Sequence, residues 1–248
     1  MTTAIYFSAT DTTKRITEAV ASFGQDRFSS INLTLKESTC SFTAEDTVIV
    51  GVPVYAGRIP QIAAERLASV KADNTKCIAL VVYGNRDYDD ALLELCDILT
   101  DQGFNVVSAG AFIAEHCIFP EVANGRPDKE DMKDIKEFAI QSFAKTAPFD
   151  LSRVKGNRPY KQPGAIPMHP SVNEMLCNSC GTCAIQCPSR AINPANPRNT
   201  DTAKCITCCR CIHICPNGAR GFSGTPYTLT SEKFTKAYSA RRSPEWCI

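Results

Sequence analysis

Two short segments, residues 177–188 and residues 205–216, decide how the second half of this chain folds. The first reads CNSCGTCAIQCP and the second reads CITCCRCIHICP. Both have the spacing C-x2-C-x2-C-x3-C-P, so each segment offers four thiols at matched positions and closes on a proline. Thiols repeated at such short intervals indicate that each segment binds a metal centre.

The spacing favours iron–sulfur clusters over zinc. A zinc site takes four thiolates from two short knuckles and gives no reason for a third cysteine two residues further on. Four evenly stepped cysteines closed by Cys-Pro are typical of 4Fe-4S binding, where three cysteines of a run hold one cluster and the fourth holds the other. The predicted ligands are Cys177, Cys180, Cys183 and Cys215 for cluster one, and Cys205, Cys208, Cys211 and Cys187 for cluster two. A zinc or disulfide framework is the alternative.

Composition limits the kind of protein that this chain forms. A length of 248 residues suggests two domains, and a hydrophobic content of 44% permits a packed core. Six of the fourteen cysteines lie outside the predicted ligand sets and show no pairing pattern, which favours a reducing compartment. Neither a leader pattern nor an apolar run of membrane-spanning length is present. We therefore expect a cytoplasmic protein of an oxygen-poor cell, without a membrane span.

Charge is distributed unevenly along the chain. Residues 1–150 carry 14 Lys and Arg against 22 Asp and Glu, whereas residues 151–248 carry 13 against 4. The first part thus has a net charge of −8 and the second of +9. Clusters bound by four thiolates are anionic, so the basic surplus offsets them, and without a base-stacking or groove-reading motif we expect no nucleic-acid partner. Opposite charges favour docking of the two parts.

The first half alternates apolar strands with amphipathic helices. Strands are expected at residues 4–7, 28–33, 47–52, 77–83 and 104–114, with helices between and after them. This order predicts a doubly wound parallel five-stranded sheet that binds a ligand at the carboxyl ends of its strands. Three irregular stretches follow strand ends, namely residues 8–13, 53–58 and 84–89, and should meet at one crevice.

The first of these stretches, S8-A-T-D-T-T13, lies between a strand and a helix. Its hydroxyls and backbone N–H groups, at the positive end of a helix, are suited to a phosphate. The stretch matches neither GxGxxG nor GxxxxGK[ST], and a plain helix cap is the other interpretation.

Residues 1–147 resemble a flavodoxin, whose phosphate loop reads T/S-x-T-G-x-T/S. Asp11 stands where that family has glycine, and its carboxylate would face the phosphate. The resemblance implies FMN, with its phosphate at Ser8, Thr10, Asp11, Thr12 and Thr13. It implies that the flavin ring contacts Pro53, Val54, Tyr55, Ala56, Gly84, Asn85, Arg86 and Tyr88, with Tyr88 stacked on the ring. A domain that has lost its flavin is the alternative.

Residues 171–222 resemble two-cluster bacterial ferredoxins, and nearly the whole chain resembles flavodoxin–ferredoxin fusion proteins. The expected organisation is an FMN domain at 1–149, a proline-rich linker at 150–170, and a two-cluster domain with a C-terminal extension at 171–248. The resemblance implies electron transfer between FMN and the clusters, linking one-electron and two-electron redox partners. The alternatives are an FMN-dependent reductase of a small organic acceptor and an iron–sulfur protein without flavin. No set of catalytic residues is identifiable.

Overall fold

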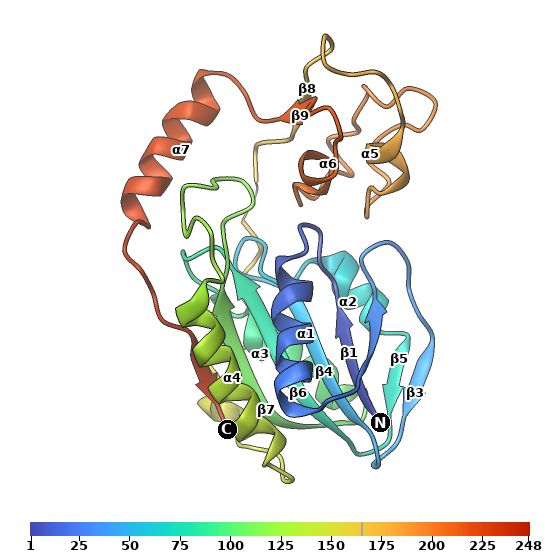
Figure 1. Cartoon of the computed structure of the whole chain (residues 1–248), viewed down its shortest axis with the longest axis vertical. Coiled ribbons are helices and arrows are strands. Elements are labelled where there is room, and N and C mark those ends of the chain that lie inside the picture. The colour runs from blue at the N-terminus through green and yellow to red at the C-terminus, as the bar shows by residue number, and fades with distance from the viewer. Residues whose placement is uncertain (165) are drawn as a thin grey trace.

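The first half of the chain is a three-layer α/β unit (Figure 1). It is seen in a computed structural model that describes residues 1–164 and 166–248. The main sheet contains the parallel strands β1 (Thr2–Tyr6), β2 (Ser29–Asn32), β4 (Thr47–Pro53), β6 (Thr75–Tyr83) and β7 (Phe104–Ile113). Their order across the sheet is β7-β6-β4-β1-β2, which is the flavodoxin-like order. The predicted doubly wound parallel sheet is therefore confirmed.

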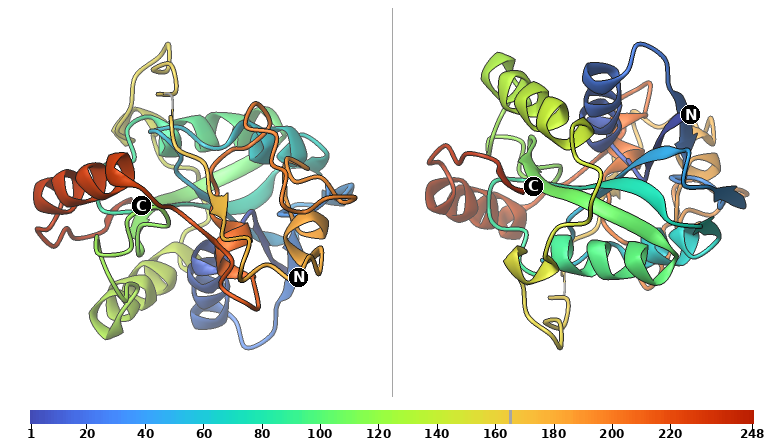
Figure 2. Two further views of the ribbon diagram at one scale, coloured as in Figure 1. Left: turned by 90° about the horizontal axis from the view of Figure 1, so that it is seen from above. Right: turned by 90° about the horizontal axis from the view of Figure 1, so that it is seen from below.

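Helices cover both faces of this sheet (Figure 2). One face packs against α1 (Thr12–Gly24) and α4 (Lys129–Phe143), and the other against α2 (Gln61–Leu67) and α3 (Ala91–Asp101). Because both faces are covered, the central strand β6 is buried almost throughout. Two short strands, β3 (Cys40–Phe42) and β5 (Val70–Ala72), pair with each other in a second ladder. None of the described helices has both the length and the apolar character needed to cross a membrane.

The cysteine-rich unit lies over the carboxyl ends of the parallel strands (Figure 1). Its two ends meet where β8 (Ser171–Val172) pairs antiparallel with β9 (Arg220–Gly221). Two single-turn helices, α5 (Thr182–Ile185) and α6 (Arg210–His213), each begin inside one of the cysteine segments. This unit has little secondary structure of its own, as expected of a fold built around metal centres.

The predicted linker, residues 150–170, is held against the α/β unit. After the short η1 helix (Leu151–Arg153), the carboxylate of Asp90 accepts hydrogen bonds from the backbone N–H groups of Asn157 (2.9 Å) and Lys161 (2.7 Å). The guanidinium of Arg58 also donates to the Lys161 carbonyl at 2.7 Å. The connection between the two units is therefore anchored to the α/β unit at Asn157 and Lys161.

The C-terminal segment returns to the first unit. After α7 (Thr225–Ala237), the strand β10 (Glu245–Cys247) pairs antiparallel with β7 and becomes a sixth strand of the main sheet. The sequence does not predict this strand, because three residues are too few for a recognisable alternation of apolar and polar side chains. The end of the segment predicted as 171–248 thus lies in the sheet of the first unit, so the chain ties the cysteine-rich unit to the α/β unit on both sides.

Candidate redox site

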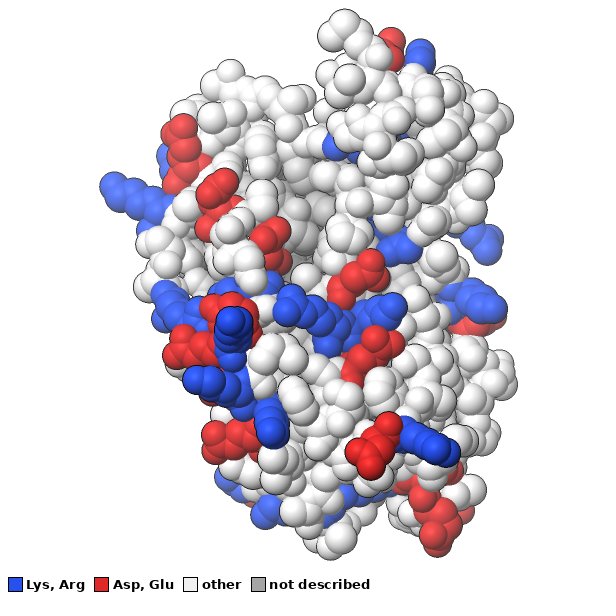
Figure 3. Space-filling view, in the orientation of Figure 1, with Lys and Arg blue, Asp and Glu red and all other residues white. Residues whose placement is uncertain are grey.

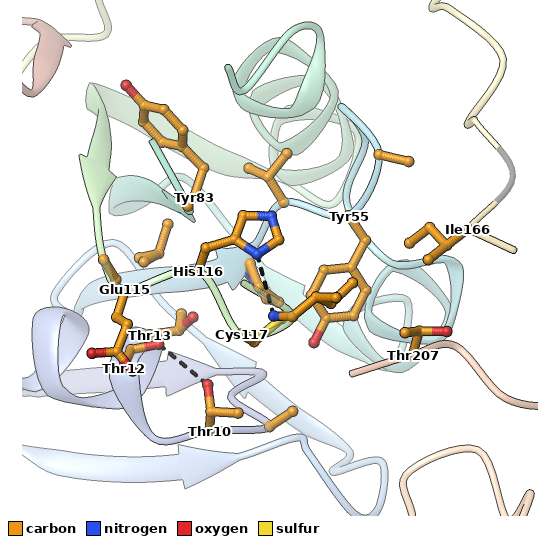
Figure 4. Close-up of a pocket in the computed structure, with 18 residues that line it drawn as sticks. Thr10, Thr12, Thr13, Tyr55, Tyr83, Glu115, His116, Cys117, Ile166 and Thr207 are labelled. Atoms are coloured by element: carbon orange, nitrogen blue, oxygen red, sulfur yellow. Dashed lines mark hydrogen bonds between the residues drawn. The ribbon is translucent and has the colours of Figure 1, made fainter. Parts of the chain in front are cut away.

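The three threonines that follow β1 form one wall of a cavity at the carboxyl edge of the sheet. Thr10, Thr12 and Thr13 line this cavity, which we call the edge cavity (Figure 4). Within the described part of the chain, no backbone or side-chain acceptor takes a hydrogen bond from the N–H groups of these three residues. Hydroxyls and free N–H groups at the first turn of α1 are suited to an anion.

Ser8 and Asp11 shape this loop without lining the edge cavity. The Ser8 hydroxyl accepts a hydrogen bond from the Lys14 N–H at 3.0 Å, which fixes the turn. Asp11 adopts a left-handed backbone with φ 62°, so it takes the conformation for which a glycine would be suited. Its carboxylate is 56% exposed and lies 3.2 Å from Nε2 of His213 in the cysteine-rich unit. The expectation that this carboxylate faces the phosphate site is therefore not met.

The second loop also lines the edge cavity. Pro53, Val54, Tyr55 and Ala56 all line the edge cavity at the end of β4. Figure 4 shows the Tyr55 ring on the side of the cavity opposite to the threonines, close to Thr207 of the cysteine-rich unit. This loop thus faces both units.

The third loop contributes only Gly84. A Cβ atom at this position would lie 2.4 Å from the His116 ring, so the close approach requires a glycine. The predicted ring contacts of Asn85, Arg86 and Tyr88 are not supported, because these side chains have other partners. The C-terminal segment binds the side chains of Asn85 and Tyr88 and so keeps them away from the cavity.

The contacts of these three residues are explicit. The Asn85 amide donates to the carbonyls of Tyr238 and Ala240, both at 2.8 Å, and Arg86 pairs with Asp89. Tyr88 is 3% exposed, and its hydroxyl donates to Glu245 at 2.8 Å. Tyr88 therefore anchors β10 instead of facing the cavity.

A fourth loop, which sequence analysis missed, completes the edge cavity. Glu115, His116, Cys117 and Ile118 follow β7 and line it. Nδ1 of His116 accepts hydrogen bonds from the backbone N–H groups of Ile118 and Phe119, both at 3.2 Å, and burial lowers the pKa of His116 to about 4. No motif spacing identifies these residues. They do follow the fifth parallel strand, however, and residues at the carboxyl ends of such strands are candidates for ligand binding.

The cysteine-rich unit contains two further cavities. One is lined by Cys177, Cys180, Cys183 and Cys215, and the other by Cys187, Cys205, Cys208 and Cys211. The structure thus brings together the two crossed sets that the sequence predicts. The fourth cysteine of each segment is held alike, since the Cys187 sulfur accepts from the Ala191 N–H at 3.3 Å and the Cys215 sulfur from the Ala219 N–H at 3.2 Å.

The spread of these thiols bears on the metal. Among residues 1–164 and 166–248, no three His, Cys, Asp or Glu side chains converge closely enough to hold a single metal ion. The preference for clusters over zinc therefore rests on the cysteine spacing.

The segments around the cavity lined by Cys187, Cys205, Cys208 and Cys211, here called the cluster-two cavity after the predicted ligand set, contact the edge of the sheet. Arg210 donates to the Ala9 carbonyl at 3.0 Å, and Arg66 donates to the Pro188 carbonyl at 2.8 Å. Thr207 lines the edge cavity while its neighbour Cys208 lines the cluster-two cavity. The two cavities are therefore separated by little more than one residue.

A larger cavity of about 480 Å³ adjoins the edge cavity, whose own volume is about 90 Å³. The two share Tyr55, Ala56, Ile166 and Thr207, and the larger one also reaches Cys205. Its charged residues, Arg58 and Glu94, form a two-pronged ion pair with both N···O distances at 2.7 Å. The two charged side chains of the larger cavity are thus paired with each other, and the rest of its wall is largely apolar.

Charges are arranged differently on the two units. Figure 3 shows acidic and basic side chains intermixed over the α/β unit and C-terminal segment, while the visible face of the cysteine-rich unit has few charged side chains. At the boundary between the units, the arginines Arg210 and Arg66 donate to backbone carbonyls, and Asp11 lies 3.2 Å from His213.

Comparisons with known proteins give separate matches for the two units. Residues 170–193 match the family model of the 4Fe-4S binding domain. No curated protein sequence matches the chain. A flavodoxin from the domain Archaea is 16% identical, covers 58% of this chain and 97% of its own, and has a TM-score of 0.40.

Two further solved structures are similar to the same part. Oxidised Flavodoxin 2 from Bacillus cereus is 16% identical over 58% of this chain and 97% of its own, with a TM-score of 0.43. An apo NADH:FMN oxidoreductase is 15% identical over 57% of this chain and 87% of its own, also with a TM-score of 0.43. The chain thus combines an α/β unit with the flavodoxin-like strand order and a cysteine-rich unit, part of which matches a 4Fe-4S binding domain.

Proposed function

We propose that this protein transfers electrons between FMN at the carboxyl edge of the sheet and two 4Fe-4S clusters in the cysteine-rich unit. One observation carries the proposal: Thr207 and Cys208, adjacent in the chain, line the edge cavity and the cluster-two cavity respectively. Cluster two would therefore be the centre next to the flavin. FMN exchanges one or two electrons, whereas each cluster exchanges one, so the chain would link the two kinds of partner.

The residues of the edge cavity fit the phosphate end of FMN. Thr10, Thr12 and Thr13 offer hydroxyls and free N–H groups, and the Asp11 carboxylate faces His213 instead of the cavity. The volume of about 90 Å³ is too small for the whole cofactor, but the adjoining 480 Å³ brings the pair of cavities into the range of ligand sites. Tyr55, which lines both, is the aromatic side chain best placed for the ring.

The two clusters would then have different roles. Cluster-two segments contact the α/β unit, while Cys180 of the first segment is exposed to solvent. A redox protein that donates or accepts electrons would approach cluster one, and cluster two would connect it to the flavin.

Cofactor content and transfer kinetics test this proposal. Protein purified anaerobically should contain about eight iron and eight sulfide per chain, with FMN. After photoreduction of the flavin, electrons should reach the clusters at a rate that is independent of protein concentration and only weakly dependent on salt. Stoichiometric zinc without sulfide, or a rate proportional to concentration, would contradict it. A first-order rate that falls steeply with salt would indicate transient docking instead.

The larger cavity favours a second candidate, an FMN-dependent reductase of a small organic acceptor. Space beyond the ring could admit a molecule, and the closed Arg58–Glu94 pair indicates that this molecule is uncharged. A neutral quinone should then be reduced with saturation kinetics, and Gln61→Trp, at the cavity wall, should raise the KM. Reduction that shows no saturation and does not respond to Gln61→Trp would leave the carrier as the sole candidate.

A further inference from the structure

The two cysteine segments can be compared position by position. Each begins a single-turn helix five residues after its first cysteine, α5 at Thr182 and α6 at Arg210. The residues two, five and eight places after the first cysteine therefore hold equivalent places on the local backbone. These residues are Thr207, Arg210 and His213 in the second segment, and Ser179, Thr182 and Ile185 in the first.

In the second segment, all three positions contact the α/β unit. Thr207 is 3% exposed and lines the edge cavity. The Arg210 guanidinium donates to the Ala9 carbonyl at 3.0 Å, and Nε2 of His213 lies 3.2 Å from the Asp11 carboxylate. These positions thus form one face of the segment, and this face docks on a folded unit beside its ligand cavity.

In the first segment, the equivalent positions form a face that we call the outer face, made by Ser179, Thr182 and Ile185. Ser179 and its neighbour Cys180 are exposed, whereas Thr207, the counterpart of Ser179, is buried. Ile185 is 78% exposed, and Oγ1 of Thr182 lies 3.4 Å from Sγ of Cys180. The outer face thus places an exposed apolar side chain and two small hydroxyls around an exposed thiol of the predicted cluster-one set.

We propose that the outer face docks a redox protein whose own contact surface is uncharged and apolar. The inference rests on the proposed function, which gives cluster one the exchange with external partners. Because the same positions of the second segment dock on a folded unit, the first segment offers an equivalent surface to a second folded partner. One electron crosses this contact at a time, so the centre that loses it is oxidised, the centre that gains it is reduced, and no bond is made or broken.

The chemistry of the partner follows from the absence of charge. The fifteen residues 175–189, MLCNSCGTCAIQCPS, contain no Asp, Glu, Lys, Arg or His. In the second segment, by contrast, Arg210 and His213 supply polar contacts to the α/β unit. A charged partner surface would lose its hydration on the outer face without gaining an opposite charge, whereas an apolar surface would bury Ile185 at little cost.

Electron exchange with two protein probes of opposite charge tests the proposal. Full-length, cluster-loaded protein is reduced anaerobically and mixed with oxidised cytochrome c, which is cationic around its haem, or with oxidised rubredoxin, which is anionic. Above about 0.1 M salt, only charges within about 10 Å of the contact influence the rate. The second-order rate of the wild type should therefore change by less than about twofold between about 0.1 M and about 0.5 M salt with either probe.

Charge-changing variants identify the surface. Ile185→Glu should raise the rate with cytochrome c and lower the rate with rubredoxin, each by about threefold at about 0.1 M salt, and Ile185→Lys should do the reverse. The matched control is Ile140→Glu on α4, since Ile140 is also exposed, and this variant should leave both rates unchanged. Wild-type rates in both Ile185 variants, changes of the same sign with both probes, or a steep salt dependence of the wild type would each overturn the proposal.

Two further measurements separate this inference from other outcomes. Flavin-to-cluster transfer is followed by flash photolysis in the same samples. Its absence in the wild type would contradict the proposed function, whereas its presence together with exchange rates that do not respond to Ile185 would overturn the outer face alone. Sedimentation of the loaded protein tests self-association: a wild-type dimer that Ile185→Glu dissociates would assign the outer face to a second copy of this chain and overturn the proposal.

Discussion

The two cysteine segments share their spacing but differ in their surroundings. Burial raises the pKa of Cys211 to about 12 in the second segment, and Cys208 is buried at the docked face. In the first segment, the Ser179 N–H lowers the pKa of Cys177 and the Thr182 hydroxyl lowers that of Cys180, which is exposed. Spacing thus predicts which thiols line the same cavity. The docked face explains which cluster would meet the flavin and which would meet a partner.

Removing the fourth cysteine of either segment should have the largest effect. Cys187→Ala should lose cluster two and Cys215→Ala cluster one, so each variant should retain about four of eight iron atoms. Flavin-to-cluster transfer should disappear in Cys187→Ala and persist in Cys215→Ala, as measured by iron content and flash photolysis. Loss of transfer in Cys215→Ala alone would reverse the inner and outer roles of the clusters.

The anion loop offers the next largest effect. Thr12→Ala removes a hydroxyl from the edge cavity and should weaken FMN binding about tenfold, the equivalent of one hydrogen bond to a charged group. Titration of flavin fluorescence measures the Kd. Thr230→Ala, on the exposed face of α7, is the control and should leave the Kd unchanged.

Acid should weaken the boundary between the units through His116. The folded protein keeps this ring neutral down to about pH 4, whereas an unfolded chain protonates it near pH 6.5. Its contribution to stability is therefore complete above pH 6.5 and is lost as the pH falls toward 4, at about 1.4 kcal/mol per pH unit. The urea midpoint of His116→Gln should fall less than that of the wild type between pH 6.5 and 5.5. If the urea midpoint falls equally in both proteins, the acid sensitivity comes from a group other than His116.

Asp11→Gly should have the smallest effect. Glycine accepts the left-handed turn, and the carboxylate that it removes is half-exposed and paired with His213. Exposed pairs of this kind contribute under about 1 kcal/mol, so the Kd for FMN should change by less than about fivefold. A tenfold tightening would instead show that the carboxylate faces the phosphate, as the sequence alone suggested.

Local patterns in the sequence determined much of this protein. The strand–loop–helix order predicted the parallel sheet and its open edge, and the spacing of cysteines predicted the sets that the structure brings together, including the crossed positions Cys187 and Cys215. The strand–loop–helix order and the spacing within each cysteine segment depend on residues within a few positions of one another, and the crossed positions follow because the same spacing occurs twice. The positions of the threonines in the first loop are also predictable from the local sequence, because they follow from the start of α1.

Only the tertiary structure decided which side chains face the edge cavity. Asn85 and Tyr88 turn away because Tyr238, Ala240 and Glu245, more than a hundred residues later in the chain, take up their hydrogen-bonding groups. His116 and Cys117 enter the cavity because the cysteine-rich unit and α7 pack against their loop. Local patterns do not encode such partners. A side chain's direction depends on which distant segment satisfies its polar atoms and buries its apolar surface, and that is settled when the whole chain packs.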